Sequence, residues 1–197
     1  MNSEPKSQST KSLSPPKARI APVTDVYHGR EITDPYRWLE DAGSAETRQF
    51  VEEENAYTRS VLQSIPGRES LRSRIEPLLT IGRVSAPRPR GNKYFYERRD
   101  GRQNQAVVYV RKEKTGTDRA LIDVNALSAD GTISLDWWYP SDDGKYVAYG
   151  TSANGSELST LQVVDVETGA LLPEKIERTR AASLVWLPDN SGFYYTR

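Results

Sequence analysis

The chain of 197 residues contains no cysteine and a single histidine, His28. The lack of cysteine excludes disulfide bonds, cysteine-ligated zinc and thiol nucleophiles. The single histidine excludes a metal site built from several histidines. We therefore expect neither a metal ion nor another cofactor.

The sequence also lacks an excess of charge of either sign and any long apolar run. Its 27 lysine and arginine residues balance its 27 aspartate and glutamate residues, and its longest apolar run, 106–110, has five residues. Proteins that bind nucleic acid or anionic lipid through charge need a net basic surface, and a membrane-spanning helix needs about 18 apolar residues. We therefore expect no nucleic-acid partner and no membrane partner.

The groups needed for serine hydrolysis are not assembled in this sequence. That chemistry holds a serine nucleophile, a histidine base and an orienting carboxylate together. The G-x-S-x-G turn that presents such a serine is missing, and His28 is the sole candidate base. We interpret His28 as a hydrogen-bonded structural residue and predict no peptide hydrolysis by this chain alone.

The first residues have a disordered composition. Residues 1–20 contain five serines and three prolines, with only Leu13 and Ile20 as sizeable apolar residues after Met1. Such a segment buries too little surface to offset its chain entropy. Its basic residues are not followed by the seven or more apolar residues of a secretory signal. We predict a disordered tail over 1–21 and a cytoplasmic protein.

Residues 22–79 carry helical signals and are expected to form a helical segment. Asp34 followed by Pro35 begins a short helical turn, because proline loses nothing at the first helical position. Ser44 caps a longer helix, which Pro66-Gly67 ends. A third helical stretch follows, and Pro77 should end or kink it near residue 75.

Beyond residue 80 the sequence changes to short β-branched and aromatic runs separated by turn residues, and it repeats. The pattern over 139–149 returns over 186–195, 47 residues later. A repeat near 50 residues with about four strands is typical of β-propeller blades. The expected strands are 93–98, 105–111, 119–123, 145–150, 161–166 and 193–196.

We therefore predict a mainly β fold class, with the helical segment followed by a partial β-propeller over 80–197. One blade covers about 84–129, a second about 133–178, and a third begins before residue 197. Propellers close with roughly four to eight blades, so we expect an open piece of a larger propeller.

Several blocks follow one another in a recognisable order along this sequence. They are Tyr27-His28-Gly29, DPYRWLED at 34–41, SAETRQFVEEEN at 44–55, GRQNQ at 101–105, NALSADGTISL at 125–135 and SDDGKYVAYGTSANGSE at 141–157. Together they resemble the N-terminal region of the prolyl oligopeptidase family of serine peptidases, from about residue 22 to 197. The Q-N-Q and L-S-x-D-G-T patterns favour the prolyl-specific branch over the oligopeptidase B branch.

This resemblance implies an enzyme in which a seven-bladed propeller caps an α/β-hydrolase domain and restricts access to short peptides. Residues 22–79 match the segment that wraps the catalytic domain, and 80–197 match the first two blades and part of a third. The α/β-hydrolase domain and its serine, aspartate and histidine triad lie outside this sequence. Short peptide substrates are therefore expected as partners only together with that domain.

The resemblance also implies one cleft-facing residue. Glu157, after Gly155-Ser156, matches a family aspartate that faces the catalytic domain across the cleft. Glutamate keeps that charge on a longer arm. Where the family places an aromatic substrate contact before the first strand of the third blade, this sequence has Ala181.

Four other features have structural interpretations that we prefer. Asp142-Asp143-Gly144 lacks the alternating acids of a calcium loop and indicates a tight turn. The adjacent acids Glu40-Asp41 point about 100° apart on a helix and form no catalytic dyad. Trp137-Trp138 indicate the core and rim of a strand, and one of the two must face outward or toward the missing domain. The fourth feature is a cluster of arginines interleaved with aromatic residues, for which we prefer a role in blade packing to nucleic-acid binding. Its members are Arg88, Arg90, Arg98, Arg99 and Arg102.

Three functional hypotheses remain open from the sequence. In the preferred one, the chain is the N-terminal portion of a prolyl oligopeptidase-like endopeptidase and is inactive alone. In the second, it is a stand-alone, non-catalytic propeller-type binding module. In the third, it pairs with a separately encoded catalytic half.

Overall fold

The computed structural model describes residues 14–180 and 183–197. The chain divides into two compact units, Met1–Arg74 and Ile75–Arg197, which are treated separately below. Most of the predicted disordered tail, 1–21, lies outside the described residues, and its described part, 14–21, contains no helix or strand.

The first unit opens with a β-hairpin that the sequence analysis did not anticipate. Strand β1 (Val23–Tyr27) pairs antiparallel with β2 (Arg30–Asp34). The two residues between them, His28 and Gly29, both have positive φ angles, 52° and 78°. A two-residue hairpin turn of type I′ requires this conformation at both central positions. The tight turn, rather than the weak alternation of the strands, identifies the hairpin.

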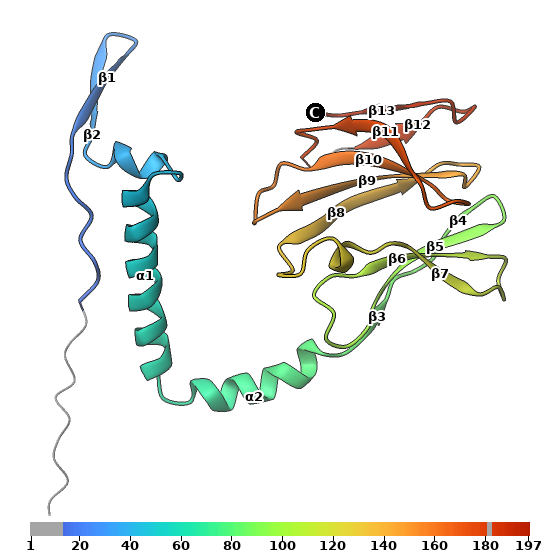
Figure 1. The fold of residues 1–197 in the computed structure, drawn as a ribbon, viewed down its shortest axis with the longest axis horizontal. Coiled ribbons are helices and arrows are strands. Elements are labelled where there is room, and N and C mark those ends of the chain that lie inside the picture. Colours follow the sequence, from blue (N-terminus) through green and yellow to red (C-terminus); the bar gives the residue numbers. More distant parts are fainter. Residues whose placement is uncertain (1–13, 181–182) are drawn as a thin grey trace, which may run out of the picture. The chain divides into compact units, whose positions relative to one another are not determined.

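Helices make up the rest of the N-terminal segment (Figure 1). The 3₁₀ turn η1 covers Arg37–Glu40, and α1 covers Ala45–Ser64. The predicted cap is confirmed, because Ser44 Oγ accepts a hydrogen bond from the Thr47 N–H at 3.1 Å. The final helix of the segment, α2, covers Arg68–Leu79.

The prediction that Pro77 ends the helix near residue 75 is wrong, whereas the alternative, a kink at that point, stays a prediction. The helix continues through Pro77 to Leu79. Proline lacks an N–H and therefore removes one helical hydrogen bond. Only two residues of helix follow Pro77, so a single lost bond is tolerated at this end.

In the described part of the second unit the strands form three antiparallel sheets, and all six predicted strands are confirmed within them. In the first sheet, β3, β5, β6 and β7 lie in that order, and β4 also pairs with β5. The second sheet has the order β8-β9-β10-β11, and β12 pairs with β13 in the third. The bounds are β3 Arg83–Val84, β4 Arg88–Arg90, β5 Lys93–Arg99, β6 Val107–Lys112, β7 Asp118–Ile122, β8 Ile133–Pro140, β9 Tyr146–Ala153, β10 Thr160–Asp165, β11 Leu171–Ile176, β12 Leu184–Trp186 and β13 Phe193–Tyr195, with the 3₁₀ turn η2 at Val124–Ala126.

The second sheet packs a different neighbour on each of its faces. Alternate residues of a strand point to opposite faces. On β9, Val147 and Tyr149 join Phe95 of β5 in one apolar cluster, whereas Ala148 joins Leu184 of β12 in another. This stacking of sheets face to face is the blade packing expected of a partial β-propeller (Figure 1).

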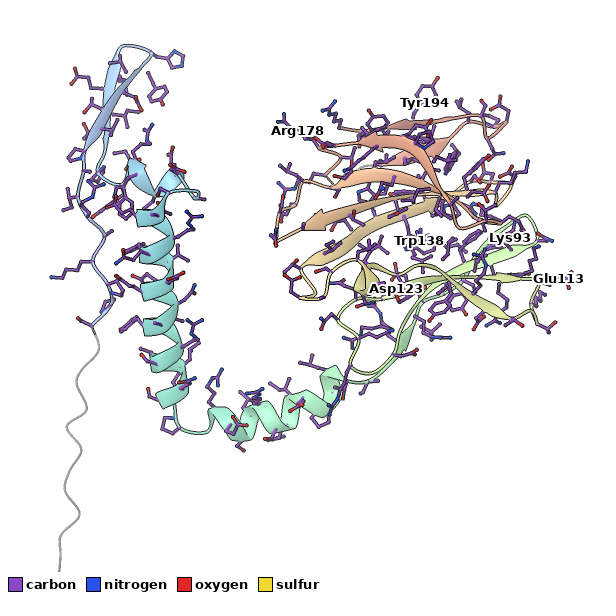
Figure 2. The ribbon with its side chains drawn as sticks, in the orientation of Figure 1. Lys93, Glu113, Asp123, Trp138, Arg178 and Tyr194 are labelled. Carbon is purple, nitrogen blue, oxygen red and sulfur yellow. The ribbon has the colours of Figure 1, made fainter. Side chains whose placement is uncertain are left out.

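Aromatic and basic side chains connect the first two sheets. Trp138 of β8 lies between them (Figure 2) and donates from Nε1 to Glu97 Oε1 at 2.6 Å. The Arg88 guanidinium lies 4.1 Å from the centre of the Trp138 ring in the second sheet, whereas Arg98 lies 4.1 Å from the centre of the Tyr109 ring within the first sheet. These arginines therefore contribute to blade packing, which supports the structural interpretation of the arginine cluster.

The repeated turns connect all three sheets at one rim. Arg90 Nε pairs with Asp142 Oδ1 at 3.3 Å, and the Asp142 N–H donates to Asn190 Oδ1 at 2.9 Å. Gly144 has a φ of 67°, and a Cβ there would lie 2.8 Å from the Arg90 carbonyl oxygen. The segment 142–144 is therefore the predicted tight turn. Only glycine fits at position 144, because any side chain would clash with the backbone of the first sheet.

Candidate cleft-facing site

The loop that carries Glu157 lies at the end of the sheets opposite the repeated turns. Both β5 and β9 begin at the rim of those turns, where Lys93 Nζ donates to the Gly144 carbonyl at 3.0 Å. The segments that follow these strands, 100–106 and 154–159, therefore lie at the opposite end, together with 177–180 after β11. We call these three segments the loop face. Figure 2 places Lys93 and Arg178 at these opposite ends.

A β-bulge in β8 brings a carboxylate to the loop face. Leu135 pairs with Thr151 and Trp137 with Gly150, so Asp136 is the extra residue between them. Asp136 accepts hydrogen bonds from Ser152 Oγ at 3.0 Å and from Ser159 Oγ at 2.6 Å. Because both serines are buried, Asp136 ties the two ends of the 154–159 loop to β8.

The neighbouring residue, Trp137, anchors the segment after β11. Its Nε1 donates to the Thr179 carbonyl at 3.3 Å. The indole lies directly on Gly150, where a Cβ would come within 2.3 Å of Trp137 Cε2. Gly150 is therefore needed for this tryptophan position, because any side chain there would displace the ring.

An ion pair joins the two segments on the loop face. Arg180 Nη2 pairs with Glu157 Oε2, and both side chains remain largely exposed, at 63% and 66%. The pair borders a cavity of about 550 Å³. The cavity is also lined by Asp136, Trp137, Tyr139 and Ser156. The site combines two aromatic faces with charges of both signs.

A second cavity opens beside the first sheet at the same end. It has a volume of about 590 Å³ and is lined by residues that include Leu78, Ile81 and Leu135. The Q-N-Q block borders it but has a structural role. The Gln105 N–H donates to Asn125 Oδ1 at 2.9 Å, and Asn125 Nδ2 donates back to the Gln105 carbonyl at 3.0 Å.

The other candidate residues stand apart from the loop face. His28 is exposed in the hairpin turn, and within residues 14–180 and 183–197 its ring makes no hydrogen bond, so its hydrogen-bonded structural role stays a prediction. Glu40 pairs with Arg37 at 3.5 Å, whereas Asp41 accepts from the Gly43 N–H at 3.1 Å. The adjacent acids thus contact separate partners.

Neither a metal-binding cluster nor a membrane-crossing helix occurs among the described residues. Over 14–180 and 183–197, no three histidine, aspartate or glutamate side chains gather into a group that could hold a metal ion. In the same ranges, no helix has both the length and the apolar character needed to cross a membrane.

The cleft-facing role of Glu157 stays a prediction. The structure puts Glu157 on the loop face, where it pairs with Arg180 and lines the same cavity as Asp136 and Trp137. Ala181, the other position implied by the resemblance, lies outside the described residues. The signal that could have revealed Asp136 is a lone acid inside the aromatic run Leu135 to Tyr139.

Family comparison agrees with this architecture. Residues 15–197 match the model of the prolyl oligopeptidase N-terminal β-propeller domain. The chain belongs to this family. The expected resemblance is thereby confirmed, and so is the expected fold class of N-terminal helices followed by a partial propeller.

Several curated relatives of this prolyl oligopeptidase-family chain are named prolyl endopeptidases or prolyl oligopeptidases. It is 33% identical to a prolyl endopeptidase from Elizabethkingia meningoseptica over 96% of its own length and 26% of the relative. It is 31% identical to prolyl oligopeptidase A from Amanita bisporigera, over 92% of its length and 27% of that protein. These curated relatives are therefore about four times as long as this chain.

Solved structures support the fold. One, from a study of two prolyl endopeptidases and their inter-domain dynamics, superposes with a TM-score of 0.80 at 38% identity, covering 92% of this chain and 27% of the other. Prolyl oligopeptidase B from Galerina marginata superposes with a TM-score of 0.73 at 23% identity, covering 93% and 29%. The catalytic domain of the family is absent from this chain.

Proposed function

We propose that this chain supplies the wrapping segment and the first propeller blades of a prolyl oligopeptidase-like serine endopeptidase that acts on short proline-containing peptides. The observation that carries this proposal is the loop face. There the Glu157–Arg180 pair borders a cavity, at the end of the sheets where the chain enters the propeller from α2. A catalytic domain connected through the preceding segment would face this end.

The two N-terminal helices support the wrapping role. In α1 only Thr47 is buried, and α2 contains no buried residue. Apolar side chains on a soluble helix are normally covered by a partner surface. A catalytic domain is the partner that the proposal assigns to them. The exposed apolar side chains are Val51, Val61, Leu62, Ile65, Leu71, Ile75, Leu78 and Leu79.

Peptide hydrolysis requires the catalytic domain, because this chain offers no activated nucleophile. The contribution of this chain to the reaction is to hold and select the substrate. The exposed carboxylate and guanidinium of the loop face would meet the peptide before it reaches the reacting groups. The propeller wall built by the stacked sheets would exclude folded proteins.

The second candidate function is a stand-alone binding module. It is supported by the packing of the sheets, which does not depend on the N-terminal helices. The two apolar clusters connect all three sheets without any residue from α1 or α2. A chain that folds by itself and binds peptides in the cavity beside Trp137 would perform this function without catalysis. A third arrangement, in which a separately encoded catalytic half binds the chain, uses the same helices and loop face as the first.

A chimera tests the preferred function against the binding module. The matching quarter of the Elizabethkingia meningoseptica prolyl endopeptidase is replaced by this chain, and hydrolysis of a chromogenic peptide with proline before the scissile bond is measured. We expect hydrolysis by the chimera and none by the chain alone. The reference is that endopeptidase with the same quarter deleted.

Two outcomes would contradict the proposal. One is a folded chimera no more active than the deleted reference. The other is a cooperative melt of the chain alone together with peptide binding measured by calorimetry, which would establish the binding module instead. To test the separately encoded half, the chain and the catalytic portion are mixed as two polypeptides, and restored hydrolysis would support it.

A further inference from the structure

The β8 bulge, Asp136-Trp137, gives one strand direct contacts to both segments that carry the Glu157–Arg180 pair. Asp136 holds Ser159, two residues after Glu157, through the 2.6 Å hydrogen bond from Ser159 Oγ. Trp137 holds Thr179, immediately before Arg180, through its 3.3 Å bond to the Thr179 carbonyl. Each member of the ion pair is thus attached within two residues of a bulge contact.

The two held residues are also bonded to each other. The Thr179 N–H donates to the Ser159 carbonyl at 2.9 Å, and Thr179 Oγ1 donates to the same oxygen at 3.0 Å. Ser159 is 1% exposed, and Thr179 is fully buried. A closed ring of hydrogen bonds therefore runs from Asp136 through Ser159 and Thr179 to Trp137. Asp136 is exposed and Trp137 is half-buried, so only the middle of the ring, Ser159 and Thr179, is shielded from water. Hydrogen bonds between buried groups favour a single arrangement.

Bulge geometry explains why these two residues can act together. In a regular strand, adjacent side chains point to opposite faces of the sheet. The extra residue at 136 interrupts that alternation, so both Asp136 and Trp137 reach the segments beside the cavity. Gly150 completes the arrangement by leaving room for the indole.

We infer that Asp136 and Trp137 are positioning residues, which fix the Glu157–Arg180 pair and hence the charge pattern that the loop face presents to a peptide. The inference rests on the proposed function only for the role of that pair in meeting substrate. The positioning itself is a property of this chain and is tested on the chain alone, without peptide hydrolysis.

The experiment compares Asp136→Ala with a matched variant at the other end of the same sheet. Asp143 holds a turn in the same way, since its Oδ1 accepts from Ser141 Oγ at 2.7 Å and from the Lys145 N–H at 3.0 Å. Both substitutions remove a carboxylate that anchors a loop. Two readouts are taken for each: amide hydrogen exchange over 154–159, and the NMR signal of the Arg180 Nε–H group.

We expect Asp136→Ala to raise exchange over 154–159 by about tenfold or more, the factor that follows from losing a hydrogen bond to a carboxylate. It should also move the Arg180 signal to its position in Glu157→Gln, where the ion pair is removed directly. Asp143→Ala should lower the melting temperature and leave both readouts at their wild-type values.

The inference fails if Asp136→Ala leaves the Arg180 signal at its wild-type position, or if Asp143→Ala moves it equally. If Asp136→Ala does not fold, the same comparison is made with Ser159→Ala and Ser159→Thr. Threonine keeps the hydroxyl, so it should restore the wild-type Arg180 signal that alanine loses. An inactive chimera combined with these results would reject the proposed function and leave the positioning role intact.

Discussion

The sheets and the N-terminal helices of this chain differ in how far they bury their apolar side chains. The sheets bury theirs against one another, so that Phe95, Val147 and Leu161 are fully buried. The helices α1 and α2 leave most of theirs exposed, although their sequence spacing is equally regular. Apolar periodicity therefore indicates which element forms, whereas the presence of a facing surface decides whether that element can stabilise the fold.

Matched leucine truncations test this difference with the largest expected effect. Leu161 of β10 is 0% exposed, whereas Leu71 of α2 is 59% exposed. We expect Leu161→Ala to lower the free energy of unfolding by about 2–5 kcal/mol, because it leaves a cavity in a packed core. Leu71→Ala should change it by no more than about 0.5 kcal/mol. Urea unfolding followed by tryptophan fluorescence measures both, and equal losses would contradict the comparison.

A pair of glycine substitutions asks how tightly the sheets are packed. Gly150→Ala places a methyl group against Trp137 and should cost about 1–3 kcal/mol of unfolding free energy. Gly192→Ala is the control, since its new Cβ would lie 3.6 Å from its nearest neighbour, Leu187 Cδ1. We expect the control to change stability by less than about 1 kcal/mol. A smaller loss of thermal stability in Gly150→Ala than in Gly192→Ala would contradict this prediction, because it would show that Trp137 can move away from the new methyl group.

The dependence of stability on pH gives the smallest expected effect. Arg111 Nε donates to Asp118 Oδ1 at 2.6 Å and lowers the pKa of Asp118. Because the folded pKa lies below the unfolded value of about 3.9, the ionised carboxylate stabilises the fold above that value. This stability is lost as the pH falls through the folded pKa. Unfolding free energy should thus decrease from about pH 5 to pH 2, and less steeply in Asp118→Asn.

The matched residue in the other unit is Glu46. Arg19 donates to it at 2.6 Å and lowers the pKa of Glu46, but both side chains are about half exposed. Solvent screens such a pair, so Glu46→Gln should alter the pH profile less than Asp118→Asn does. Denaturant titrations between pH 2 and pH 5 provide the comparison, and a larger change in Glu46→Gln would contradict it.

Local signals in the sequence predicted much of the fold. Ser44 identified the start of α1, and β-branched runs identified the most buried strands. The hairpin over 23–34 was missed because its strands are exposed and lack clear alternation. Strand β11 was missed because Leu171–Ile176 contains a proline and charged residues, which an edge strand tolerates.

The candidate site was far less predictable than the fold. Glu157 came from family resemblance, and no local pattern links it to Arg180 or to Asp136. Their association depends on the register of β8 against β9, which a single bulged residue shifts. Long-range register of this kind is determined by packing between strands rather than by the composition of either strand.

Amide hydrogen exchange along the chain, first alone and then joined to the catalytic domain in the chimera, tests directly whether α1 and α2 wrap a catalytic domain. We expect slow exchange in β5, β6, β9 and β10 in both states. In α1 and α2 we expect rapid exchange in the chain alone and slow exchange in the chimera. Helices protected as strongly as the sheets in the chain alone, or unprotected in both states, would contradict the claim that they wrap a catalytic domain.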